Sequence, residues 1–208
     1  PGPGGTTAAC CVSGIRMLAG SNIIIDHVSN SWAVDENMTN WFAQSKITVS
    51  WSIMSEGLSN STHTEGEHSK GYLVGDAAKE VSIHHNLFAH NIDRNPMIKP
   101  DTTSEVINNL IYNWGKPANG ATNFGGAAED STKKLILADA VGNHYIRGIN
   151  TPTGTNDKGI SVGIYDAIDA ASRLYAKDNI GPGRLINTGD DWLAVNGSTS
   201  FRSTSPVA

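Results

Sequence analysis

Six short β-rich stretches recur along the chain, each with a residue near its centre that occupies a comparable place. They are IIIDHVS from Ile23, ITVSWSI from Ile47, VSIHHNLF from Val81, VINNLIYN from Val106, VGNHYI from Val141 and YAKDNIG from Tyr175. The comparable residues are Val28, Ser52, Asn86, Asn109, Asn143 and Asn179, separated by 24, 34, 23, 34 and 36 residues. Repeats of roughly 20–50 residues are typical of solenoids and propellers.

The segments between these stretches have no long helical apolar stripe, which argues against βαβ crossovers. A right-handed parallel β-helix fits the pattern better, since each coil needs only short strands and its loops vary in length. The sequence therefore predicts an all-β solenoid of about six visible coils, with residues 1–208 forming a single domain.

Four of the six comparable residues are asparagines. Stacked about 4.8 Å apart at one bend, their amides can hydrogen-bond along the stack and satisfy buried polar groups. The alternative is that asparagine is simply a common turn residue.

The first predicted strand, SGIRML, begins at Ser13 with no amphipathic helix before it. Solenoid ends need caps. We expect either that N-terminal coils or a cap are missing from this chain or that a partner, including a second copy, covers this end. The opening PGPGG, without Met, indicates a mature or truncated chain.

The chain has 208 residues and a formal net charge of −5. It contains no block of Lys and Arg, which argues against nucleic-acid binding. It has no run of 18 apolar residues, which excludes a membrane-spanning helix. Its two cysteines, Cys10 and Cys11, are adjacent; they match no metal or redox spacing and would form a strained disulfide at best.

Charged residues fall at similar distances beyond the repeated bend. Asp35 and Glu36 lie seven and eight residues beyond Val28 in one coil. Two coils later, Arg94 lies eight residues beyond Asn86. Loops that leave the same corner should stack, about 10 Å apart for two coils. With Lys70 between these coils and Lys99 shortly after Arg94, we expect a groove suited to a polyanion and a divalent cation, most naturally Ca²⁺.

Four stretches, taken together and in order, resemble polysaccharide lyase family 1, the pectate lyases. They are NIIIDHVSNSWAVDE, ITVSWSIMSEGL, VSIHHNLFAHNIDRNPMIK and VINNLIYNWG, and the resemblance covers about residues 13–115. It implies a right-handed parallel β-helix that is secreted and cleaves polygalacturonate by calcium-assisted β-elimination.

The resemblance also implies roles for basic residues. The R-x-P-x-x-R pattern of the family falls on Arg94, Pro96 and Lys99. Arg94 would then be the catalytic base and Lys99 a cation that holds a substrate carboxylate. Lys70, in KGYLVGD, resembles a lysine of the family that binds substrate and supports catalysis; a solvated charged turn is the alternative.

For the metal, the resemblance implies Asp35 as a calcium ligand, with Glu36 as the alternative by one register; a turn-capping role for Asp35 stays open. The sequence departs from the family at further carboxylate positions, which here hold Cys11, Ser13, Thr39 and Asn40. The resemblance therefore implies a weak calcium site, or one completed by substrate.

The histidines have structural explanations. The Asp26–His27 pair matches a family signature that looks like an internal polar network beside the groove wall. His84 and His85 are consecutive, so in a strand they would point to opposite faces. His63 and His68 lie in a polar loop without a third ligand at metal spacing, and we assign them no role.

Three functional classes follow. The first is a calcium-dependent lyase on polygalacturonate-like chains. The second is a weakened β-helix that binds acidic polysaccharide or is structural. The third is a hydrolase that uses paired carboxylates, for which Asp190 and Asp191 lie far from the motif region.

Overall fold

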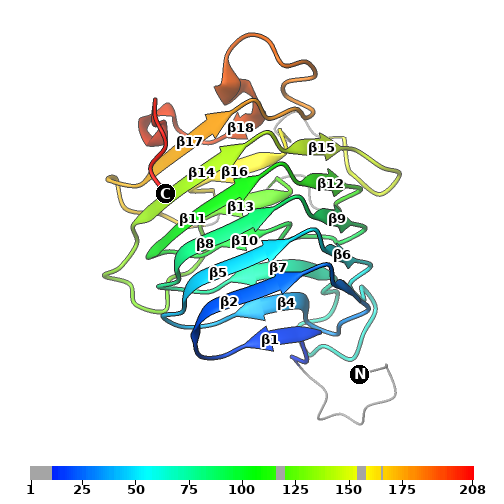
Figure 1. Cartoon of the computed structure of the whole chain (residues 1–208). Helices are drawn as coiled ribbons and strands as arrows, with labels where there is room; N and C mark the ends of the chain where they lie inside the picture. The colour runs from blue at the N-terminus through cyan, green and yellow to red at the C-terminus, as the bar shows by residue number, and fades with distance from the viewer. Residues whose placement is uncertain (1–10, 116–119, 154–157, 165) are drawn as a thin grey trace.

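The computed structural model describes residues 11–115, 120–153, 158–164 and 166–208. Within them the strands form three parallel sheets, and each strand pairs with the corresponding strand of the next coil. Figure 1 shows the strands stacked from β1 at one end to β17 and β18 at the other. This is the predicted parallel β-helix.

The first sheet has seven strands and carries the functional cleft described below. Its strands, in spatial order, are β1 (Ile15–Met17), β4 (Glu36–Asn40), β7 (Lys70–Val74), β10 (Met97–Ile98), β13 (Thr122–Phe124), β16 (Ile160–Val162) and β18 (Val195–Asn196).

The other two sheets complete each coil. The six-stranded sheet contains β2 (Ser21–Asp26), β5 (Ser45–Ser50), β8 (Lys79–His84), β11 (Thr102–Ile107), β14 (Ile136–Val141) and β17 (Arg173–Lys177). The five-stranded sheet contains β3 (Ser29–Ser31), β6 (Ile53–Ser55), β9 (Leu87–Ala89), β12 (Leu110–Tyr112) and β15 (His144–Ile146).

Inward-facing side chains of all three sheets form one continuous core. Alternation along each strand sends every second side chain inward, and parallel register stacks like on like. The largest fully buried side chains are Trp114, Tyr72, Phe88, Phe124, Met38, Ile47, Met54, Leu73, Ile83, Ile98, Ile111 and Ile136.

Five of the six repeated stretches prove to be two strands joined by a bend rather than one strand each; in the sixth, Ile180 forms only an isolated bridge beyond the bend. At every bend, the residue just before the comparable position has a positive φ, as at Trp51, His85 and Asn108. This left-handed conformation turns the chain from the six-stranded to the five-stranded sheet.

The predicted asparagine ladder is confirmed, and it includes all six comparable residues. The backbone N–H of Asn86 donates to Oδ1 of Asn109 at 2.9 Å, and the N–H of Asn109 donates to Oδ1 of Asn143 at 3.0 Å. Asn143 bonds to Asn179 in the same way, and Ser52 bonds to Asn86. The side-chain amides also bond along the stack and to buried carbonyls.

The two ends of the solenoid differ. At the β1 end, Ile15, Ile23 and Ile25 face the core but are only partly buried. At the other end, two short 3₁₀ helices, η1 (Asp191–Ala194) and η2 (Thr199–Phe201), bring Trp192 and Phe201 against the core. Among the described residues, no helix has the length and apolar character needed to cross a membrane.

The ladder can be tested with Asn109→Ala. This change leaves the Asn86 N–H and the Ile83 carbonyl without the partners they have now, and buried unsatisfied groups cost about 1–3 kcal/mol each. We expect the free energy of unfolding in urea to fall by about 3 kcal/mol. Exposed Asn150→Ala is the control; equal losses in the two variants would contradict a structural ladder.

Candidate functional site

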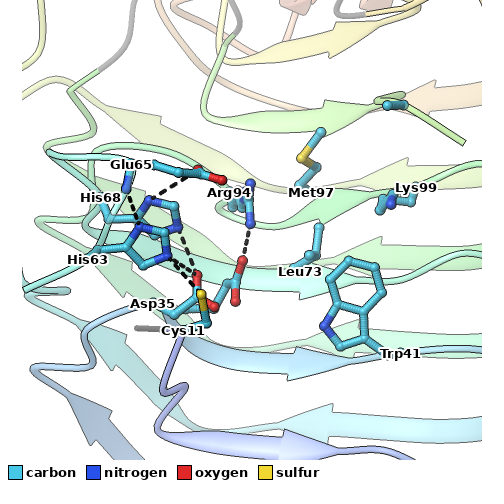
Figure 2. Close-up of a pocket in the computed structure, with 12 residues that line it drawn as sticks. Cys11, Asp35, Trp41, His63, Glu65, His68, Leu73, Arg94, Met97 and Lys99 are labelled. Carbon is cyan, nitrogen blue, oxygen red and sulfur yellow. Dashed lines mark hydrogen bonds and ion pairs between the residues drawn. The ribbon is translucent and has the colours of Figure 1, made fainter. Parts of the chain in front are cut away.

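A cleft of about 290 Å³ lies on the outer face of the seven-stranded sheet. Its lining comes from coils far apart in sequence: Cys11, Asp35, Glu36, Trp41, His63, Glu65, His68, Leu73, Arg94, Met97, Lys99 and Ala127. Figure 2 shows the imidazoles and Asp35 at one end, Trp41 and Lys99 at the other, and Arg94 between them. The predicted groove is therefore present.

A β-bulge presents Arg94 to this cleft. Lys70 pairs with Asp93, but Leu73 pairs with Met97, so the later strand has one more residue between these pairs than β7 has. An extra residue of this kind bends the strand and redirects a side chain. Arg94 lies within the bulge with a φ of 59°.

Arg94 contacts Glu36 directly. Nη1 of Arg94 forms an ion pair and hydrogen bond with Oε1 of Glu36, a residue that is 2% exposed. The other oxygen, Oε2, accepts from the Ser13 hydroxyl at 3.3 Å. The predicted groove had carboxylates at one end and cations at the other, whereas here the long arginine side chain spans the coils and joins the two. Nε of Arg94 is buried without a hydrogen-bond acceptor.

Asp35 lies among imidazoles rather than free carboxylates. Nε2 of His68 is 2.8 Å from Oδ1 of Asp35, and Nε2 of His63 is 3.7 Å from the same atom. The two imidazole rings stack with centroids 3.6 Å apart. The sequence analysis found no third group near His63 and His68; the fold supplies one, Asp35, from the preceding coil, and both histidines line the cleft.

The loop between β6 and β7 orients these rings. The Glu65 backbone N–H donates to Nδ1 of His63 at 3.2 Å, and the Glu65 carboxylate lies 3.9 Å from Nδ1 of His68. Burial lowers the pKa of His63, and neighbouring His68 adds to that effect. Sγ of Cys11, a half-cystine, lies 3.6 Å from Nε2 of His63; Cys10 lies outside the described residues.

The two adjacent carboxyls differ in acidity. Burial raises the pKa of Glu36; Arg94 opposes this rise and Asp35 adds to it. Burial also acts to raise the pKa of Asp35. Its hydrogen bonds with His68 and Glu36 and the nearby imidazoles outweigh burial, so the pKa of Asp35 is lowered. Glu36 is therefore the carboxyl of the pair that takes up a proton first.

Lys99 occupies the opposite end of the cleft with two acidic partners. Its Nζ lies 3.3 Å from Asp76 and 3.2 Å from Glu129, and 4.7 Å from the centre of the Trp41 ring. Asp76 is largely shielded, whereas the Glu129 side chain is 66% exposed. Lys99 and Arg94 therefore share one cleft, as predicted.

Lys70 does not line the cleft. It is 5% exposed, and its Nζ lies 3.4 Å from Oδ2 of Asp93. Oδ1 of Asp93 accepts a hydrogen bond from Nδ2 of Asn123. Oδ1 of Asn123 in turn accepts a hydrogen bond from the Ser161 hydroxyl. Lys70 thus belongs to a buried polar row beside the cleft, and its substrate-binding role stays a prediction.

Four other residues differ from the sequence interpretation. Asp26 and His27 bond to each other, but they are exposed at a bend rather than internal. His84 and His85 do not point to opposite faces, because His85 lies at the bend; their Nδ1 atoms are 3.0 Å apart and His85 stacks on Trp51. These residues lie outside the cleft lining.

The described donors do not suit calcium, which takes six to eight oxygen ligands. Imidazole nitrogens of His63 and His68 lie beside Asp35, and the cluster with Asp35 and His68 has only one other carboxyl, Glu36. Asn40 accepts from the Tyr72 hydroxyl in the core, and Thr39 donates to a strand carbonyl. Neither therefore replaces a missing carboxylate beside Asp35.

Sequence comparisons identify relatives of the chain. A "Probable pectate lyase C" of Aspergillus terreus is 30% identical in an alignment of length 193 that covers 87% of this chain and 42% of that protein. Proteins with the same name from Aspergillus oryzae and Emericella nidulans are each 37% identical, over 64% and 66% of this chain.

The chain resembles pectate lyases over this segment. It spans less than half the length of these curated relatives, 42%, 27% and 28% respectively. No protein-family model matches the sequence. The alignment of 193 residues is longer than the stretch 13–115, so the pectate lyase resemblance extends beyond the motifs quoted above.

The acidity of Glu36 gives a stability test. A carboxyl with a raised folded-state pKa stabilises the fold while protonated, and this contribution is lost as the pH rises through that pKa. The glutamine side chain of Glu36→Gln stays neutral at every pH. The melting temperature of this variant relative to the parent should therefore rise as the pH increases from 4.5, the ordinary pKa of glutamate, toward neutrality.

Calorimetry at several pH values measures this difference, with Glu80→Gln at an exposed position as the control. A difference that stays constant or falls with rising pH would show that burial does not raise the pKa of Glu36.

Proposed function

We propose that this chain is the groove-bearing segment of a secreted pectate lyase-like enzyme that cleaves polygalacturonate by β-elimination. The observation that carries the proposal is Arg94, the residue that matches the family's base, held by a bulge in a cleft on the β-helix surface. The names of the fungal relatives support the same class of reaction.

In this reaction Arg94 removes the proton from C5 of a galacturonate unit. Arg94 accepts this proton in its neutral form, the C5–H electron pair forms the C4=C5 double bond, the C4–O bond breaks, and the leaving oxygen takes a proton from water. The buried Nε of Arg94, which has no acceptor now, is a further donor that can bind the substrate carboxylate. Hydrogen bonds that stabilise the developing charge are usually the largest catalytic contribution.

Arg94 has to part from Glu36 before it can act on substrate. Separating a buried ion pair is costly because it leaves an uncompensated charge. Burial raises the pKa of Glu36 and Asp35 adds to that rise, so Glu36 is a weaker partner for the guanidinium than an exposed carboxylate would be. Arg94 must then lose its own proton before it can accept the one from C5. Glu36 is therefore proposed to control the availability of Arg94.

Lys99 is proposed to hold a second carboxylate of the polymer. Its partner Glu129 is largely exposed, and exposed ion pairs contribute only about 0–1 kcal/mol. A substrate carboxylate can thus replace Glu129 at little cost. Calcium, which the resemblance implies, stays a prediction, and no step of the proposed reaction is assigned to it.

The lyase assignment is tested by incubating the protein with polygalacturonate and following the ultraviolet absorbance of the unsaturated product. Arg94→Ala should lower the rate at least about 100-fold, since a general base contributes about 10²–10⁴-fold. Arg173→Ala, at an arginine outside the cleft lining whose guanidinium donates to the backbone carbonyls of Ala170 and Ser172, is the control. An Arg94→Ala rate equal to that of the parent would rule out Arg94 as the base.

The role of Lys99 is tested with two opposite changes. Lys99→Ala should raise KM about tenfold with a smaller effect on kcat, because a charge-assisted hydrogen bond contributes about 1.5–3 kcal/mol. Glu129→Ala removes the competing carboxylate and should lower KM. A KM that is unchanged in both variants would argue against a substrate carboxylate at Lys99.

A second candidate function is binding of acidic polysaccharide without cleavage. The Arg94–Glu36 ion pair favours it, because the proposed base is occupied in the described conformation. Binding without new absorbance or new reducing ends would support this alternative, whereas reducing ends without absorbance would indicate a hydrolase. Asp190 and Asp191 pair with Arg202 and Arg184 and do not line the cleft.

A further inference from the structure

Three possible metal ligands converge beside Arg94. One oxygen of Asp35, one oxygen of Glu36 and one nitrogen of His68 all lie within 4.8 Å of one another. Glu36 is 2% exposed and His68 is 4% exposed. They come from consecutive coils, so the solenoid itself fixes their separation.

His68 has a carboxylate near each of its ring nitrogens. A metal-binding histidine usually donates its other ring N–H to a carboxylate, which fixes the ring and its tautomer. Here Nε2 faces Asp35 and Nδ1 faces the Glu65 carboxylate, 3.9 Å away. When a metal takes Nε2, the ring proton moves to Nδ1, on the side of Glu65. The stacked ring of His63 holds the plane of His68.

We propose that Asp35, Glu36 and His68 form a site for a divalent transition metal, with Zn²⁺ as the best match. Imidazole suits Zn²⁺ and similar ions, whereas Ca²⁺ takes oxygen ligands. Two carboxylates and one imidazole supply three ligands and two negative charges, which leaves a fourth position for water or substrate. The proposal concerns metal binding and does not depend on lyase activity.

The site and Arg94 compete for Glu36. In the described conformation the guanidinium holds Oε1 of Glu36. A metal that takes this carboxylate releases Arg94 into the cleft, and metal and guanidinium repel each other. Removing Arg94 should therefore strengthen metal binding, an effect that a purely structural Glu36 would not produce.

The test is calorimetric titration of the chelator-treated protein with Zn²⁺ and, separately, with Ca²⁺. We expect one Zn²⁺ per chain, bound at least about 100-fold more tightly than Ca²⁺. His68→Ala should weaken Zn²⁺ binding at least about tenfold, while His144→Ala, at an exposed histidine on β15, should not change it. Arg94→Ala should tighten it.

A measurement on the parent protein removes the risk that His68→Ala fails to fold. With Co²⁺ in place of Zn²⁺, proton spectra should show a strongly shifted imidazole N–H signal that disappears in deuterated water. Tighter binding of Ca²⁺ than of Zn²⁺, or the absence of that signal at full Co²⁺ occupancy, would overturn the proposal. Unchanged Zn²⁺ affinity in folded His68→Ala would do the same.

Discussion

The column of hydrogen bonds from Val28 to Asn179 is the constraint on which the rest of the molecule depends. Each backbone N–H in the column donates to the side chain one coil further on. The ladder residues from Ser52 to Asn179 are buried, so these groups have few other partners, and the column fixes the register of all three sheets. Loops of different length can then leave each coil without altering the stack, and the cleft residues come largely from such loops.

One extra residue in this regular framework creates the site. Between Asp93 and Met97 the chain has one more residue than β7 has opposite it, and Arg94 is redirected toward Glu36. The ion pair that results links the proposed base, the acidity of a buried carboxyl and the proposed metal ligands. A change at any one of these groups is therefore expected to alter the other two.

The repeat predicted the fold because burial and hydrogen bonding at each bend demand particular residues at particular spacing. The spacing of Asp35, Glu36 and Arg94 beyond the bends also predicted that they share one groove, and all three line the cleft. It missed His63 and His68, since their partner Asp35 belongs to the preceding coil and loop conformation leaves no periodic signal. The signal that was available was Asp35 itself, at the predicted groove with Thr39 and Asn40 where a further carboxylate was expected.

The cleft contains its own counter-ions. Arg94 is neutralised by Glu36, and Lys99 by Asp76 and Glu129, in a chain whose net charge is −5. Little positive field therefore extends into solvent to draw in a polyanion from a distance. Capture has to proceed by exchange of one carboxylate for another at short range. Association should accordingly gain no acceleration from long-range electrostatic attraction, even at low ionic strength.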